Sequence, residues 1–379
     1  MKTFRKIIFW MHLIFGLSAG IFIFIMCVTG ALLSFEKNII QFAERDMRAV
    51  EIPSENARRL PLNDLVGKVI EAKPNAKPSN ITYQKDKSAA ASVALGREGQ
   101  VFVNPYNGEI TGEGATNLRS FFGIVEDAHR WLAFSGGGRQ VGKSLNDAAN
   151  LLFLMLAISG VYIWFPREFT RRHLAPILWF RRTNSGKARD FNWHNVFGFW
   201  SSLVLILLTI TGVIISYQWA GNLLYTLTGN DLPPQQQQNQ PNQQTEQAFV
   251  LPENLENSLQ TAENHTNWKT ISLRLPIVKD SAVFTIEEGI YWNILARSTL
   301  TVDPKTAQIS KWEPYGGQNT ARKLRSWARF THTGETGGFI GQLIGFVACI
   351  GGAVLVFTGI SLAIRRFWHW RSRRTDAGI

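Results

Sequence analysis

The chain has 379 residues, of which 45% are hydrophobic and 18% charged, and its formal net charge is +12. The basic excess comes from three short segments, with +3 before the first apolar block, +5 in 166–190 and +4 in 365–379. This distribution excludes a nucleic-acid footprint, because the large segments between them are together neutral. The two cysteines lie inside apolar blocks, which excludes a disulfide framework and a structural zinc or iron–sulfur site.

Four blocks at 9–35, 148–165, 194–217 and 338–364 hold most of the apolar residues. Each reaches the roughly 17 to 20 residues that a membrane span requires. The first is too long for a signal peptide and lacks a cleavage site. The predicted segments are 1–35 (first span), 36–147 (first exported region), 148–165 (second span), 166–190 (basic loop), 191–217 (third span), 218–337 (second exported region), 338–364 (fourth span) and 365–379 (tail).

The charges also predict the orientation of the spans. Short loops rich in Lys and Arg stay in the cytoplasm. We therefore expect both termini and 166–190 to be cytoplasmic, and both large regions to be exported.

Each exported region has the pattern of a small α+β domain. The stretches FVNPYNGEITGE (102–113) and TVDPKTAQISKW (301–312) indicate two strands joined by an Asn/Asp-Pro turn. Strand-like and helix-like runs precede both, and LPPQQQQNQPNQQTEQ indicates a flexible linker. The predicted fold class is an α-helical membrane protein with four transmembrane helices in a tandem two-helix repeat and two α+β domains.

Histidines recur at matching places in the two halves. His12 in FWMHLIFGL aligns with His194 in NWHNVFGFW, and the same alignment matches Gly16 with Gly198 and Thr29-Gly30 with Thr211-Gly212. His129 in EDAHRWLAF and His332 in ARFTHTGET each precede a later span. A tandem repeat places its halves around an axis along the membrane normal. We therefore expect His12 with His194 near the inner face, and His129 with His332 near the outer face.

Two imidazoles on opposite sides of one metal suit haem b, because the porphyrin supplies the other four nitrogens. Zinc is less suitable, because neither level offers further carboxylate or thiolate ligands. The opposing interpretation is that these histidines are only interfacial anchors, since Trp and Arg belts are ordinary at both membrane faces. Expected cofactor or propionate contacts are Trp10, Gly16, Trp193, Phe197 and Gly198 at the inner level, and Arg130, Trp131, Arg139, Arg325, Trp327 and Arg329 at the outer level.

These motifs resemble those of the PepSY-associated transmembrane proteins, and among them the siderophore ferric reductases. The resemblance rests on WMHLIFGL, HRWL, WHNVFGFW and FTHTGETGG and on the paired turns VNPYNGEI and VDPKTAQI, and it covers essentially the whole chain. It implies two haems b, each ligated by two of His12, His129, His194 and His332, in a bacterial inner membrane beneath two periplasmic PepSY-like domains. Ala307 stands where such a turn usually has Gly, which puts the second domain in doubt as a functional unit.

The function implied by the resemblance is transmembrane electron transfer that reduces a periplasmic Fe(III)-siderophore and releases Fe(II). Irons at the two levels would lie on the order of 20 Å apart in a core about 30 Å thick. No nucleotide-binding motif occurs, so the cytoplasmic electron donor is expected to be a separate molecule. Two alternatives remain: a non-enzymatic PepSY membrane protein that binds or regulates a partner, and a di-haem conduit to a quinone or redox protein. The sequence identifies neither the siderophore nor the oligomeric state.

Overall fold

The structure is a computed structural model that describes residues 2–96, 99–166, 168–232, 251–252, 255–277, 281–289 and 296–376. The chain divides into two compact units, which we call the membrane unit and the sheet unit. The membrane unit comprises Met1–Glu36, Phe121–Asn230 and Ala321–Ile379, and the sheet unit comprises Lys37–Ser120 and Asp231–Thr320. Most of the predicted Gln-rich linker lies outside the described residues.

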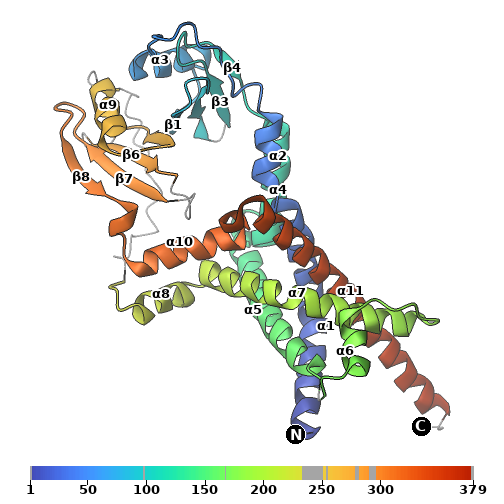
Figure 1. The fold of residues 1–379 in the computed structure, drawn as a ribbon. Coiled ribbons are helices and arrows are strands. Elements are labelled where there is room, and N and C mark those ends of the chain that lie inside the picture. Colours follow the sequence, from blue (N-terminus) through green and yellow to red (C-terminus); the bar gives the residue numbers. More distant parts are fainter. Residues whose placement is uncertain are drawn as a thin grey trace. The chain divides into compact units, whose positions relative to one another are not determined.

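Four long helices dominate the membrane unit, and each is long and apolar enough to cross a membrane (Figure 1). They are α1 (Lys2–Leu33), α5 (Arg139–Trp164), α7 (Gly186–Ser216) and α11 (Gly338–Asp376). The prediction of a four-span membrane protein is confirmed. Three helices extend beyond their predicted spans: α5 begins at Arg139, α7 begins at Gly186, and α11 continues to Asp376.

The four helices form a bundle in which α1 and α7 each pack against both α5 and α11. The helices α1 and α7 therefore lie on one diagonal of the bundle, and α5 and α11 on the other. Small residues allow this close packing: a Cβ at Gly352 of α11 would lie 2.6 Å from Cys27 Sγ of α1. Shorter helices of this unit are α4 (Thr116–Trp131), α6 (Arg171–Leu178), α8 (Gln218–Leu227) and α10 (Thr320–His332).

Strands from both halves of the chain form one antiparallel sheet of eight strands in the described residues, in the order β4-β3-β2-β1-β5-β6-β7-β8 (Figure 1). The strands β1 and β5 join the halves, with Asn80 opposite Arg274 and Gln84 opposite Thr270. The bounds are β1 (Asn80–Gln84), β2 (Ala91–Ala94), β3 (Gln100–Val103), β4 (Ile110–Gly112), β5 (Thr270–Arg274), β6 (Ala282–Glu287), β7 (Arg297–Val302) and β8 (Ile309–Glu313).

One helix from each half packs on this sheet, α3 (Leu62–Ala72) from the first and α9 (Leu255–His265) from the second. The inward face of the sheet and the apolar faces of both helices share one hydrophobic core, which includes Leu65, Leu255 and Phe284. Burial alternates along β1, β5 and β6, as expected for strands with one covered face. Each half therefore contributes the α+β elements predicted for it, and the core is common to both.

The two predicted turns have the same conformation. In the first, Asn104 Oδ1 accepts a hydrogen bond from the backbone N–H of Tyr106, and Gly108 has a φ of +76°. In the second, Asp303 Oδ1 accepts one from the N–H of Lys305, and Ala307 has a φ of +55°. Ala307 thus takes a left-handed backbone conformation that glycine adopts more easily, and the turn keeps its shape.

Candidate functional site

The first histidine pair lies between the diagonal helices α1 and α7. The ring centres of His12 and His194 are 6.4 Å apart, and their planes are at 84°. Each side chain extends from its helix toward the interior of the bundle, because the two rings meet although α1 and α7 do not pack as neighbours. The structure therefore brings together the two histidines that the repeat predicts to be partners.

The second pair comes from helices that precede the spans. His129 lies in the last turn of α4 and His332 is the last residue of α10. Their ring centres are 6.3 Å apart with an interplanar angle of 53°. Both pairs thus have almost the same separation, although one lies on spanning helices and the other does not.

A hydroxyl group of a neighbouring span binds the Nδ1 atom of every one of these four histidines. The pairs are His12 with Ser159 Oγ at 2.8 Å, His194 with Thr358 Oγ1 at 2.9 Å, His129 with Thr29 Oγ1 at 2.8 Å, and His332 with Thr211 Oγ1 at 3.1 Å. The backbone carbonyl of Leu208 also lies 2.9 Å from Nδ1 of His332.

The direction of these hydrogen bonds follows from the hydroxyl groups. Thr29 donates its hydroxyl proton to the carbonyl of Ile25 at 2.6 Å, and Thr358 donates to that of Val354 at 2.7 Å. Ser159 and Thr211 likewise donate to carbonyls of their own helices. Since the proton of each hydroxyl is used, its oxygen accepts from imidazole Nδ1–H. We therefore assign each ring as the Nδ1–H tautomer, with its free lone pair on Nε2.

Glycine follows each of the four hydroxyl residues, and three of these glycines make room for an imidazole. A Cβ at Gly160, Gly359 or Gly30 would lie 3.5, 3.3 or 3.4 Å from Cε1 of His12, His194 or His129. At the fourth, Gly212, a Cβ would instead lie 2.8 Å from Nδ2 of Asn150. The Ser/Thr-Gly dipeptide is therefore a repeated histidine contact, in which the hydroxyl binds Nδ1 and, in three of four cases, the glycine makes room for the ring. Sequence reasoning matches Thr29-Gly30 with Thr211-Gly212 and the SG of SGVYIW with the TG of TGISLAI, but it misses their role as contacts of the histidine rings.

The spacing along the helices separates the two pairs. Thr29 follows His12 by 17 residues, and Thr211 follows His194 by the same number. At 1.5 Å per residue this is about 26 Å along the helix. The pairs therefore lie toward opposite ends of a bundle that spans about 30 Å of hydrocarbon.

Burial disfavours the charged form of the His129 and His332 imidazoles. Burial lowers the pKa of His129 to about 4, with His332 adding to the effect and the carbonyl of Met26 opposing it. Burial also lowers the pKa of His332, opposed by its hydrogen bond to Leu208. Neutral imidazole is the form that binds a metal.

The geometry fits a metal held by both rings. Two imidazoles that bind one metal from opposite sides at about 2.0 Å, with ring centres about 1.2 Å behind their nitrogens, have their centres roughly 6.4 Å apart. Both pairs match this distance. No group of three or more His, Cys, Asp or Glu side chains assembles among the described residues. A bare ion would lack ligands, whereas a macrocycle that supplies four nitrogens would complete the set.

The other predicted inner contacts lie near the bundle surface or pack on neighbouring helices. Trp10 is 43% exposed, and Trp193 is 38% exposed. Trp193 and Phe197 each make an edge-to-face contact with Phe180. Gly16 and Gly198 face Leu156 and Leu355, where a Cβ would lie at 3.8 and 3.6 Å. These contacts describe helix packing and surface aromatics.

At the outer level the predicted residues gather around Trp131. The guanidinium groups of Arg130 and Arg139 lie 4.2 and 3.5 Å from its ring centre. Both also pair with carboxylates of α4, Arg130 with Glu126 at 2.8 Å and Arg139 with Asp127 at 3.2 Å.

The predicted outer residues of the second half lie on α10. Trp327 is 48% exposed. Arg325 lies beside Gly221 of α8, and Arg329 lies in the last turn of α10 with His332. The outer level thus offers cations from both halves, of which Arg130 and Arg139 already have carboxylate partners.

The comparisons with known proteins agree with this architecture. The family model of the PepSY-associated TM region matches residues 9–366. A comparison with curated proteins found no match. Because the family match includes all four long helices, all four histidines and both sets of strands, the chain belongs to the family of the PepSY-associated TM region.

Proposed function

We propose that this membrane protein transfers electrons across the bilayer through two bis-histidine haems b and reduces a periplasmic Fe(III)-siderophore. The observation that carries the proposal is the pair of imidazole separations, 6.4 and 6.3 Å, at opposite ends of one bundle. Every imidazole also has its Nδ1 atom bound, which leaves Nε2 for a metal. Interfacial anchors would not need this arrangement four times.

The residues that would hold the haems are His12 with His194 and His129 with His332. Haem b bound at these pairs would supply one-electron redox chemistry at two depths of the membrane. The hydroxyl groups fix the ring orientation and raise the basicity of the ligands, because a histidine that donates through Nδ1 is a stronger donor through Nε2. The apolar residues between the pairs, such as Ile23 and Met26, exclude water from this part of the bundle.

The substrate assignment rests on iron chemistry and on the resemblance described above. Siderophores hold Fe(III) through hard oxygen ligands and hold Fe(II) much more weakly. One electron delivered to the chelate therefore releases the metal. In the proposed orientation the termini and basic loop are in the cytoplasm of a bacterial inner membrane, and a separate cytoplasmic molecule donates the electron.

The test has two stages and uses the purified full-length protein. The first is an absorption spectrum, oxidised and dithionite-reduced, with a count of extractable haem. We expect low-spin bands and two haems per chain. A folded preparation without haem would reject the electron-transfer function and favour a non-enzymatic membrane protein of this family.

The second stage separates the acceptors. Reduced protein is mixed anaerobically with Fe(III) chelates of catecholate, hydroxamate and carboxylate type, and released Fe(II) is captured by a ferrous chelator. We expect the protein to be reoxidised and one Fe(II) to be released for each haem that loses an electron. If a quinone or a redox protein reoxidises it and no ferric chelate does, the siderophore assignment is wrong and the di-haem conduit remains.

A further inference from the structure

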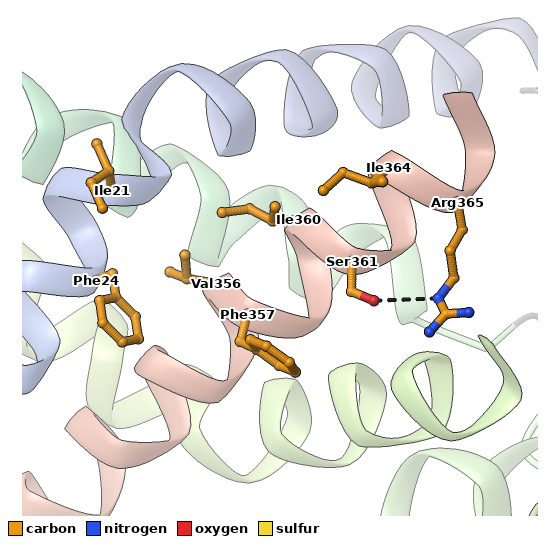
Figure 2. A pocket seen from close by; sticks show the side chains of 8 residues that line it. All are labelled: Ile21, Phe24, Val356, Phe357, Ile360, Ser361, Ile364 and Arg365. Carbon is orange, nitrogen blue, oxygen red and sulfur yellow. Dashed lines mark hydrogen bonds between the residues drawn. The ribbon is translucent and has the colours of Figure 1, made fainter. Parts of the chain in front are cut away.

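An apolar groove of about 410 Å³ lies between α1 and α11 (Figure 2). Its walls are Ile21 and Phe24 of α1 and Val356, Phe357, Ile360 and Ile364 of α11. Ser361 and Arg365 form its polar end, and Figure 2 shows Arg365 Nε donating to Ser361 Oγ, at 3.4 Å. The groove is thus an amphipathic site, with hydrocarbon walls and a cation at one end.

The length of the groove corresponds to one leaflet of a bilayer. From Val356 to Arg365 the helix rises about 14 Å at 1.5 Å per residue, and half of a hydrocarbon core is about 15 Å. Ile21 and Phe24 lie beyond the middle of α1, so the closed end of the groove is near the bilayer centre. The cationic end therefore reaches the head-group level on the side of the N-terminus.

Two guanidinium groups stand at this end of the groove. Arg366 lies 4.9 Å from the ring centre of Phe9 and 5.0 Å from that of Trp10, both on α1. Arg365 has 44% of its side chain exposed, and its Nη2 atom is 3.6 Å from Asp190 Oδ2. Asp190 is buried and also binds Arg189 and Ser361. The exposed charge at the groove mouth is consequently positive.

We propose that this groove binds one anionic phospholipid of the leaflet on the N-terminal side. An acyl chain would fill the apolar part, and the phosphate would accept hydrogen bonds from Arg365, whose planar fork has donors to spare. Basic pockets between spanning helices at the cytoplasmic face recognise anionic head groups in this way. A neutral isoprenoid would fit the walls but would have no anionic group to bind the guanidinium groups at the mouth of the groove.

Such a lipid would hold α1 and α11 together beside the inner histidine pair. The helix α1 carries His12, and α11 carries Thr358, which binds His194 and lies one turn before Ser361. The bound lipid would therefore stabilise the side of the bundle that carries one inner imidazole and orients the other.

The proposal is tested by native mass spectrometry of the delipidated full-length protein. The probes are phosphatidylglycerol and phosphatidylcholine with identical acyl chains. We expect one phosphatidylglycerol per chain, bound at least about fivefold more tightly than phosphatidylcholine, the gain expected of one basic residue near the head group. Arg365→Gln should remove this preference. Arg373→Gln, on the same helix two turns further, should keep it.

A second variant tests the apolar part. Ile360→Trp fills the groove and keeps its charges, so both lipids should bind more weakly, and thermal unfolding reports whether each variant is folded. Equal binding of the two lipids would overturn the proposal, and so would an unchanged preference in Arg365→Gln. An isoprenoid quinone that occupies the site and displaces phosphatidylglycerol would also overturn it.

Discussion

The two halves of the chain agree at the histidine sites and differ elsewhere. In both halves a histidine of the first span meets its partner at the inner level, and a histidine before the second span does so at the outer level. In both halves a Ser/Thr-Gly dipeptide lies on each span. Around the sites the halves diverge: Asp190 binds Ser361 in the second half, whereas Ile8 occupies the aligned position of the first.

The agreement indicates what the repeat preserves. Every span contributes to a histidine site, with α1 and α7 contributing to both sites and α5 and α11 to one each. At the inner level α1 and α7 provide the imidazoles while α5 and α11 provide the hydroxyls. At the outer level α1 and α7 provide the hydroxyls instead. Each histidine site is therefore built from both halves of the chain, and neither half contains a complete site.

Removal of an imidazole should have the largest effect. Which haem is lost should depend on the level at which the histidine lies, not on the half of the chain that contains it. We expect His12→Ala and His194→Ala to remove the same haem, and His129→Ala and His332→Ala to remove the other, so each variant keeps one haem per chain. Pyridine haemochrome counts and spectra measure this. His173→Ala is the control, because His173 is exposed and pairs only with local groups. If the two variants within one half of the chain gave the same spectrum, the assignment of one haem to each level would be wrong.

The second prediction concerns Glu44, which has Thr226 as its aligned counterpart in the second half. Glu44 directly follows α2 (Glu36–Ala43) and is fully buried. Its carboxylate accepts hydrogen bonds from Arg119 at 2.7 and 2.8 Å, from Arg48 at 2.6 Å and from the N–H of Ala115 at 3.0 Å. Removal of one partner of such a buried pair costs about 3–5 kcal/mol. Glu44→Gln should lower the free energy of unfolding by about 3 kcal/mol, whereas exposed Glu55→Gln should leave it unchanged.

The pH dependence of this effect has a definite sign. Burial alone would raise the pKa of Glu44, but the hydrogen bonds from Arg119, Ala115 and Arg48 outweigh it and lower the pKa. The stabilisation is therefore complete above the ordinary carboxyl pKa and is lost as the pH falls through the lowered value. Thermal unfolding at several pH values should show Glu44→Gln and the parent protein converging in acid. Parallel curves would contradict this assignment.

The third prediction compares the hydroxyl partners of two histidines, one from each half. Ser159 Oγ is the partner of Nδ1 in His12, whereas Nδ1 of His332 has both Thr211 Oγ1 and the carbonyl of Leu208. Ser159→Ala should lower haem retention about 10- to 100-fold and shift the midpoint potential of the inner haem upward, because its ligand is less basic. Thr211→Val should have a smaller effect.

Redox titration and haem dissociation rates measure both variants. Ser159→Thr is the matched control, because Thr358 occupies the corresponding position of the second half and binds His194. Equal effects of Ser159→Ala and Thr211→Val would show that the carbonyl of Leu208 does not support the ring.

The smallest effect is expected at the turns of the sheet unit. Ala307→Gly relieves a left-handed conformation that costs a non-glycine residue about 1–2 kcal/mol, less about 0.5–1 kcal/mol for the added freedom of the unfolded chain. The variant should be more stable by roughly 0.5–1 kcal/mol in chemical unfolding. Gly108→Ala should be less stable, since a Cβ there would also displace Lys68. A destabilised Ala307→Gly would contradict this interpretation.

The sequence predicts the spans and the histidine partners because both follow from periodic, repeated signals. The apolar pattern does not show that α5 begins at Arg139, before the predicted span, because Asn146 and Asp147 interrupt it. Both are buried with partners: Asn146 donates to the carbonyl of His129 at 2.9 Å, and Asp147 pairs with Lys143. Polar residues that are satisfied inside a bundle cannot be distinguished from loop residues by composition alone.

The sequence does not predict the continuous sheet, because the pairing of β1 with β5 depends on strands in different halves. Thr82 and Ser272 hydrogen-bond across this junction at 2.7 Å, and neither residue type signals a partner. The roles of Trp10, Arg130 and Arg139 were also assigned by composition, and the partners of these side chains depend on helix geometry that a pattern does not contain.

The pairing of β1 with β5 also has a consequence for biosynthesis. The strand β1 leaves the ribosome before α5 and α7, and its neighbour β5 is made only after both of these spans. During that interval β1 has an open edge, which is a site for wrong pairing with other chains. This edge therefore needs protection until β5 is made, either by a chaperone or by rapid synthesis of the second half.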